Sequence, residues 1–153
     1  MRIILAAIAL AALPMAAAAQ SALDRYEAAS ELLQANTYNF FESRVPGLAA
    51  VRPSTDWTAA DRQAGACLIE GLRAAKGDAG VATYLSDLEA FARQPITSIA
   101  AMSANTPASL ADAQTVQIGS SCGTDKIGQA QMQRSGLVAQ LSNPVVLSRI
   151  MAQ

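Results

Sequence analysis

The chain has 153 residues, of which 52% are hydrophobic and 15% charged, with a formal net charge of −1 and no histidine. The absence of histidine excludes Ser-His-Asp and Cys-His catalysis and most histidine metal sites. The charges are scattered, so no basic run indicates binding to nucleic acid or to an anionic membrane surface. A chain of this length fits one domain with a substantial core.

The first residues are typical of a bacterial export signal. Arg2 precedes an apolar run that contains Pro14 and ends in Ala17-Ala18-Ala19 before Gln20. The alternative is an uncleaved membrane anchor, but the run is short, mostly alanine and interrupted by proline. The sequence therefore predicts a cleavable signal peptide over residues 1–19. The mature domain, residues 20–153, is expected to be periplasmic or secreted, with no stable membrane span after cleavage.

A first helix is expected over residues 21–42, where apolar side chains repeat at helical spacing. Phe40 and Phe41 belong to the densest aromatic cluster in the chain, near the end of this helix. We interpret the cluster as a helix end that packs into the core, in preference to an aromatic ligand site. Residues 44–47 then predict a turn, and residues 48–57 an irregular loop.

The central stretch predicts a helical hairpin with arms over residues 58–76 and 78–93. Thr58, with Asp61 three residues later, is a variant of the capping box that begins a helix. Gly77 follows a cation and is suited to end the first arm. The break between the arms is too short for anything but a hairpin between close neighbours.

One face of each arm carries apolar residues at helical spacing. The two faces consist of Ala64, Cys67, Leu68, Gly71, Leu72 and Ala75, and of Val81, Tyr84, Leu85, Leu88, Phe91 and Ala92. Gly71 either lets a neighbouring helix approach the first arm closely or is a weak spot in the helix, since glycine there costs about 1 kcal/mol against alanine. Trp57, just before the hairpin, is expected to pack its ring over the start of this arm.

Breaker residues divide the rest of the chain into further helices. These helices are predicted to begin at Pro95, at Pro107 or Ser109, at Thr124 and after Asn143-Pro144. Residues 115–118 alternate like a strand, but a helix to about Gly119 is favoured because no partner strand is visible elsewhere. Residues 120–123 then predict a turn, and the next helix is expected to run to residue 141. The predicted fold is all-α, a single-domain bundle of about six or seven helices.

Cys67 and Cys122 are expected to form one disulfide, since this is the simplest pairing in an exported chain with two cysteines. The chain-entropy estimate for a loop of this length is about 4 kcal/mol of stabilisation, as an upper figure. The Cys-x-x-Cys spacing of redox enzymes is absent, and two thiols without histidine do not complete a zinc site. The pair therefore predicts a structural crosslink, and no metal or other cofactor is expected.

No catalytic residues are predicted. The sequence contains no phosphate-binding loop and no nucleophile elbow. The acids Glu27 and Glu31 lie one helical turn apart, and Asp87 and Glu89 lie in the second arm of the hairpin. Carboxylates on helical faces are usually solvated, so we interpret these as surface groups.

Two functions remain open. The favoured one is a non-catalytic exported protein that binds another envelope protein or peptide through an apolar helical face. The alternative is a small-molecule binder or carboxylate-based enzyme with Tyr26, Tyr38 or Tyr84 in a pocket between helices. An enclosed pocket with a perturbed acid would favour the alternative, whereas a solid core with an exposed apolar groove would favour the first. The candidate surface for the first consists of Phe40, Phe41, Val145, Val146, Leu147, Ile150 and Met151.

Overall fold

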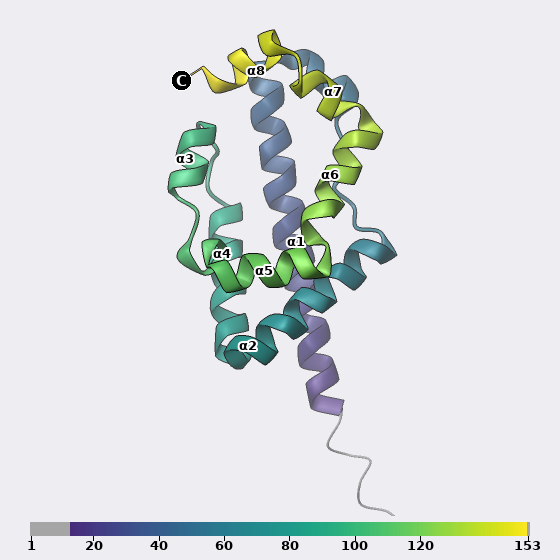
Figure 1. Cartoon of the computed structure of the whole chain (residues 1–153), viewed down its shortest axis with the longest axis vertical. Helices are drawn as coiled ribbons and strands as arrows, with labels where there is room; N and C mark the ends of the chain where they lie inside the picture. Colours follow the sequence, from purple (N-terminus) through teal and green to yellow (C-terminus); the bar gives the residue numbers. More distant parts are fainter. Residues whose placement is uncertain (1–12, 153) are drawn as a thin grey trace, which may run out of the picture.

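Helices are the only regular structure in the part of the chain that the computed structural model describes, residues 13–152. Figure 1 shows α1 running the length of the molecule, with the other helices arranged along it. The expected all-α, single-domain fold is confirmed, with more and shorter helices than predicted. The elements are α1 (Leu13–Arg44), the 3₁₀ helix η1 (Pro46–Val51), α2 (Ala59–Ala92), α3 (Ile99–Ala104), α4 (Ala108–Ala111), α5 (Ala113–Cys122), α6 (Thr124–Ser135), α7 (Leu137–Leu141) and α8 (Pro144–Met151).

α1 begins at Leu13, earlier than the expected start at residue 21. The alanine-rich stretch before residue 21 explains the earlier start, because alanine has the highest helix propensity. The predicted cleavage point before Gln20 falls within this helix, and most of the predicted leader lies outside the described residues. Among residues 13–152, no helix is both long enough and apolar enough to cross a membrane.

α2 is a bent helix whose two arms form the predicted hairpin, and Figure 1 shows them meeting at a sharp angle. The Thr58 hydroxyl oxygen accepts a hydrogen bond from the Asp61 N–H at 3.3 Å, and the Asp61 carboxylate accepts one from the Thr58 N–H at 2.7 Å. The predicted capping box is therefore present. At the bend, Gly77 has φ 69° and ψ −179°, a conformation that residues with side chains rarely adopt.

The main core lies where α1 packs against the two arms of α2. On the first arm, Gly65 and Ile69 are buried, whereas Cys67 and Ala75, which were predicted on the buried face, are exposed. The buried face of this arm therefore differs from the predicted one, because α1 packs on one side of the arm and α5 packs on another. The second arm buries its apolar residues as predicted. The core residues are Ala22, Ala29, Leu68, Ile69, Leu72, Val81, Tyr84, Leu85 and Leu88.

A second cluster of buried side chains lies where η1, α7 and α8 meet the C-terminal half of α1. Residues 46–51 form η1 here, in place of the turn and the start of the irregular loop that the sequence predicted. Pro46 suits the first position of a helix, and Leu48 is only 3% exposed. Burial of Leu48 stabilises a short helix that local signals alone do not predict. The buried members of this second cluster are Tyr38, Phe40, Leu48, Leu137 and Ile150.

Of the helices after α2, α3, α5 and α8 begin with a side-chain cap. α3 begins at Ile99 rather than at Pro95, because the Ser98 hydroxyl accepts a hydrogen bond from the backbone of the first turn. Of the two starts considered for the next helix, Pro107 is used, and Ser109 lies within α4. α4 follows Pro107, and Asp112 caps α5 directly afterwards.

Two glycines with positive φ set the helix ends in the last third of the chain. Residues 115–118 are helical, as favoured, but α5 continues through Cys122 to Gly123, φ 75°, where a turn was predicted from residue 120. Gly136, φ 84°, divides the helix expected to run to residue 141 into α6 and α7. Glycine is the residue that most readily adopts this left-handed conformation.

α5 lies close against the first arm of α2. A Cβ on Gly71 would lie 2.5 Å from Ile118 Cγ2, so the expected close approach of a neighbouring helix is confirmed. Cys67 and Cys122 lie in the same contact, with their sulfur atoms 1.99 Å apart at disulfide distance and their Cα atoms 5.7 Å apart. The predicted pairing therefore joins α2 to the last residue of α5.

Candidate functional site

The candidate interaction surface divides between the core and the solvent. Phe40 and Ile150 are only 6% and 3% exposed, so their assignment to an exposed surface was wrong. Both belong to the second cluster, because α8 docks against the end of α1. Phe41 and Val146 are partly buried against the same cluster.

α8 presents the remaining predicted residues to solvent. Val145, Leu147 and Met151 are 59%, 48% and 53% exposed, and we call these three side chains the α8 surface. Val146 and Ile150 lie four residues apart on the docked side of the helix. Leu147 and Met151 have the same spacing one position later and face solvent. The C-terminal helix therefore docks on the bundle and also presents an apolar surface.

The charged side chains in this part of the chain are all positive. After Asp125, the only charged side chains are Lys126, Arg134 and Arg149. Arg134 lies in the last turn of α6 and Arg149 in the last turn of α8, and both are exposed. The α8 surface therefore combines apolar side chains with positive charge.

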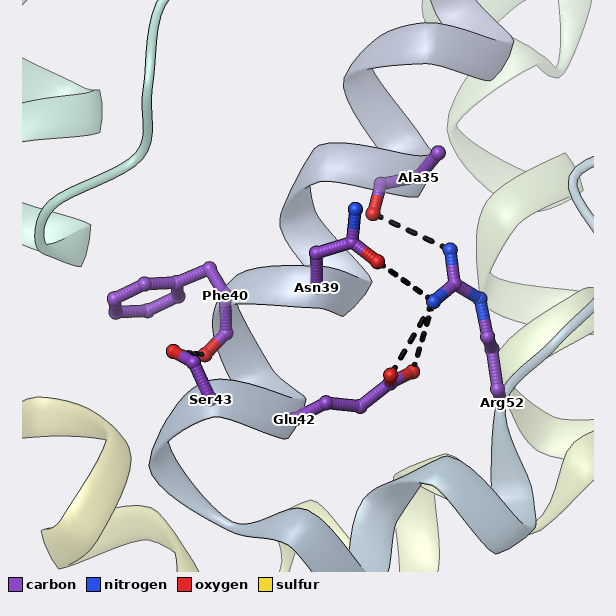
Figure 2. A network of polar contacts seen from close by, with 6 residues as sticks. All are labelled: Ala35, Asn39, Phe40, Glu42, Ser43 and Arg52. Atoms are coloured by element: carbon purple, nitrogen blue, oxygen red, sulfur yellow. Dashed lines mark hydrogen bonds and ion pairs between the residues drawn. The ribbon is translucent and has the colours of Figure 1, made fainter.

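Arg52 fastens the end of η1 to α1, on the side shown in Figure 2. Its guanidinium donates hydrogen bonds to the Asn39 side-chain oxygen at 2.8 Å and the Ala35 carbonyl at 3.4 Å, and it pairs with Glu42 at 3.1 Å. Figure 2 shows Phe40 on the opposite side of α1 from this network. The end of α1 is thus held on two sides, which gives α8 a fixed base.

Tyr38, one of three tyrosines considered for a pocket, is a core residue of the second cluster and is 5% exposed. The Arg52 guanidinium carbon lies 5.9 Å from the centre of its ring. Burial raises the pKa of the Tyr38 hydroxyl, and the nearby positive charge of Arg52 opposes that rise. Tyr38 is therefore part of the support beneath α8.

Tyr26 and Tyr84, the other two tyrosines, line an open cleft of about 340 Å³ among α1, α2, α4, α5 and α6. We call it the tyrosine cleft. The centres of the two rings lie 6.1 Å apart. Burial raises the pKa of both hydroxyls, so both are protonated at neutral pH. The apolar lining consists of Leu68, Leu110 and Val116.

The polar lining of the tyrosine cleft comes from α5 and α6. The hydroxyl of Thr115 donates a hydrogen bond to Asp112 at 2.8 Å, and that of Thr124 donates one to a backbone carbonyl at 3.1 Å. Ser120 and Asp125 are exposed at the mouth. Within the described residues, neither of these two side chains has a hydrogen-bond or ion-pair partner.

Three of the four acids that the sequence placed on helices are engaged by other side chains. The guanidinium of Arg25 lowers the pKa of Glu89 through a hydrogen bond, which keeps that carboxylate ionised. No group of three or more His, Cys, Asp or Glu side chains within residues 13–152 could hold a metal ion. The engaged pairs are Glu27–Arg62, Glu89–Arg25 at 2.7 Å and Asp87–Ser109 at 2.6 Å.

A second open groove, of about 530 Å³, lies beside the cysteine pair between the first arm of α2 and α5. Its lining is mostly apolar and includes Gly71, Ala74 and Ile118. The groove and the tyrosine cleft are both open to solvent, so neither encloses an acid away from water.

Comparisons with protein-family models, with curated proteins and with solved structures all find no match. The surfaces of this chain therefore carry the functional argument. The sequence pointed to Tyr26 and Tyr84, but it missed Ser120 and Asp125. Their place at the cleft follows from the corner at Gly123, which turns α6 away from α5.

Proposed function

We propose that the protein is a non-catalytic, exported binding protein that holds an acidic, apolar segment of another envelope protein or peptide on the α8 surface. One observation carries the proposal. Five large apolar side chains are exposed among the described residues, and three of them, Val145, Leu147 and Met151, lie on the eight-residue α8. Apolar side chains gathered in this way are typical of interaction sites.

The support beneath α8 favours binding. Ile150 is 3% exposed in the second cluster, so α8 is already docked in the free protein. A partner would meet a preformed surface and would not have to order the helix, which lowers the entropy cost of association. Arg52 binds this end of α1 on one side, and the Phe40 ring lies buried on the opposite side of the helix (Figure 2).

Charge selects the kind of partner. Lys126, Arg134 and Arg149 follow Asp125 without any further acid. Of these, Arg149 lies on α8 itself, and a positive group beside an apolar patch favours an oppositely charged partner, because charge complementarity steers association and excludes wrong partners. A segment with acidic side chains beside apolar ones fits this combination.

Export is part of the proposal. The signal-like leader motivates it, and a cysteine pair at disulfide distance is compatible with an oxidising compartment. The test is the intact mass of the native protein before and after reduction and alkylation. We expect loss of residues 1–19 and thiols that react only after reduction. A full-length chain with two free thiols would contradict export.

Binding is tested by selecting peptides from a random library on the wild-type protein, with counter-selection on the Leu147→Ser/Met151→Ser double variant. We expect the enriched peptides to contain acidic and apolar residues and to bind the double variant at least tenfold more weakly. Leu32→Ser removes a side chain that is 40% exposed on α1, and it serves as the matched control with unchanged affinity. When the same library is selected on the Arg149→Glu variant, the enriched peptides should contain more basic residues than those selected on the wild type.

Three results would overturn the proposal. The first is peptides that bind the double variant as tightly as the wild type. The second is reversible dimerisation in analytical ultracentrifugation that the double variant abolishes, since the occupant of α8 would then be a second copy. The third is co-flotation with anionic phospholipid vesicles that depends on Leu147 and Met151.

A further inference from the structure

The tyrosine cleft has an apolar interior and a single charged group. Tyr26 and Tyr84 stand together on its inner side, with Leu68 and Val116 among the apolar lining. Among the described residues that line the cleft, Asp125 supplies the only carboxylate, and none is Lys or Arg. Its volume of about 340 Å³ lies at the low end of the range for small-molecule sites, roughly 300–1,000 Å³.

The cleft offers few free hydrogen-bonding groups. The hydroxyls of Tyr26 and Tyr84 are largely desolvated, and those of Thr115 and Thr124 already donate to oxygens of the protein. A sugar or other polyol needs many partners at once, so it does not fit this lining. Of the polar groups at the mouth, the Ser120 hydroxyl and the Asp125 carboxylate remain available.

The charge balance at the mouth favours a cation. α5 ends and α6 begins at the Gly123 corner. The negative partial charge at the end of α5 and the positive partial charge at the start of α6 therefore offset each other there. The charge that remains is the carboxylate of Asp125. Lys126, the residue after Asp125, does not line the cleft, and Lys76 is held by Asp112 and Thr115 and does not line it either.

We propose that the tyrosine cleft binds a small organic cation: an ammonium group held at Asp125 and Ser120, with an apolar or aromatic body against the tyrosines. Aromatic rings contribute to such binding because their faces attract cations and their edges pack against apolar groups. This site is separate from the α8 surface, which belongs to the other cluster of buried side chains.

Three probes with the same aromatic body test the charge preference. They are phenethylamine as the cation, phenethyl alcohol as the neutral analogue and phenylacetate as the anion, each titrated by calorimetry into the full domain. We expect the amine to bind at least tenfold more tightly than the alcohol, and phenylacetate to show no binding. Affinity for the amine should fall as salt is raised, because the ion pair at the mouth is screened.

Variants of Asp125 and Ser120 test whether these residues form the proposed cation site. Asp125→Asn should weaken amine binding about three- to tenfold without changing the affinity for the alcohol, whereas Asp125→Glu should retain preference for the amine. Glu70→Gln makes the same change of charge on an exposed residue outside the cleft, and it should leave all affinities unchanged. Ser120→Trp fills the mouth from an exposed position and should abolish binding of the amine and the alcohol.

The proposal is wrong if the alcohol binds as tightly as the amine, or if Asp125→Asn has no effect. Failure of all three probes to bind at millimolar concentration would also overturn it. Leu147→Ser/Met151→Ser should not change amine binding, and Ser120→Trp should not change peptide binding. The two proposals can therefore fail separately.

Discussion

The contact between Trp57 and Gly65 is the most sensitive packing point at the start of α2. A Cβ on Gly65 would lie 2.6 Å and 2.9 Å from two carbons of the indole ring and 3.0 Å from Leu23 Cδ1. On its other side the indole packs edge-on against Tyr26, with ring centres 5.2 Å apart. The ring therefore has little room to move, and we expect Gly65→Ala to destabilise the protein.

Two opposing effects determine how much Gly65→Ala changes the free energy of unfolding. Replacing glycine by alanine within a helix stabilises it by about 1 kcal/mol, whereas forcing an extra carbon into a packed contact costs about 1–3 kcal/mol. Gly65→Ala should therefore lower the free energy of unfolding by up to about 2 kcal/mol. Gly128→Ala is the matched control, because no heavy atom lies within 4 Å of its added Cβ. That variant should gain up to about 1 kcal/mol.

Urea unfolding measures both variants, and the fluorescence of the single tryptophan reports on the contact itself. Displacement of Trp57 by the new methyl group should shift its emission to the red in Gly65→Ala and leave it unchanged in Gly128→Ala. Equal stabilisation of the two variants, with unchanged emission, would refute the placement of Trp57 over Gly65.

Three further predictions concern the crosslink, the core and a surface ion pair. Cys67→Ser and Cys122→Ser should lower the melting temperature by similar amounts, with no further loss in the double variant, and additive losses would mean that the cysteines are not partners. Leu88→Ala, at a site 4% exposed, should cost about 2–5 kcal/mol in urea unfolding, and a near-neutral result would contradict its burial. Lys76 and Thr115 lower the pKa of Asp112 below its usual value, so this carboxylate should stabilise the fold fully above about pH 4 and lose that effect progressively as the pH falls from there through the lowered pKa. Asp112→Asn should lower the urea midpoint more at pH 7 than at pH 3, where part of the stabilisation is already lost, and equal losses would contradict the ion pair.

The sequence predicted the helix starts and ends that depend on interactions between residues close together in the chain. The Thr58 capping box, the Gly77 bend and the Asn143 cap of α8 each depend on contacts within a few residues. The all-α class follows from such signals together with helical periodicity. Gly136 is also a local stop, and the sequence interpretation missed it because apolar residues continue at helical spacing on both sides.

Where the helical periodicity of the sequence fits more than one buried face, tertiary contacts determine which residues are buried. α8 carries apolar residues at two adjacent four-residue spacings, so its sequence does not say which pair docks. The structure buries Ile150 and exposes Leu147, a distinction set by contact with the second cluster. The same holds for Cys67, whose exposure follows from the side on which α5 packs.

The cysteine pair links these contacts to the proposed cation site. Cys67 precedes Leu68, which lines the tyrosine cleft, and Cys122 follows closely after Ser120 at its mouth. Reduction should therefore loosen the α5 side of the cleft and weaken amine binding, because the crosslink ties these two walls together. The α8 surface rests on the second cluster, which contains no cysteine, so peptide binding should persist. Titrations of both ligands with and without dithiothreitol test this difference, and an equal loss of both affinities would show that the two sites are not independent.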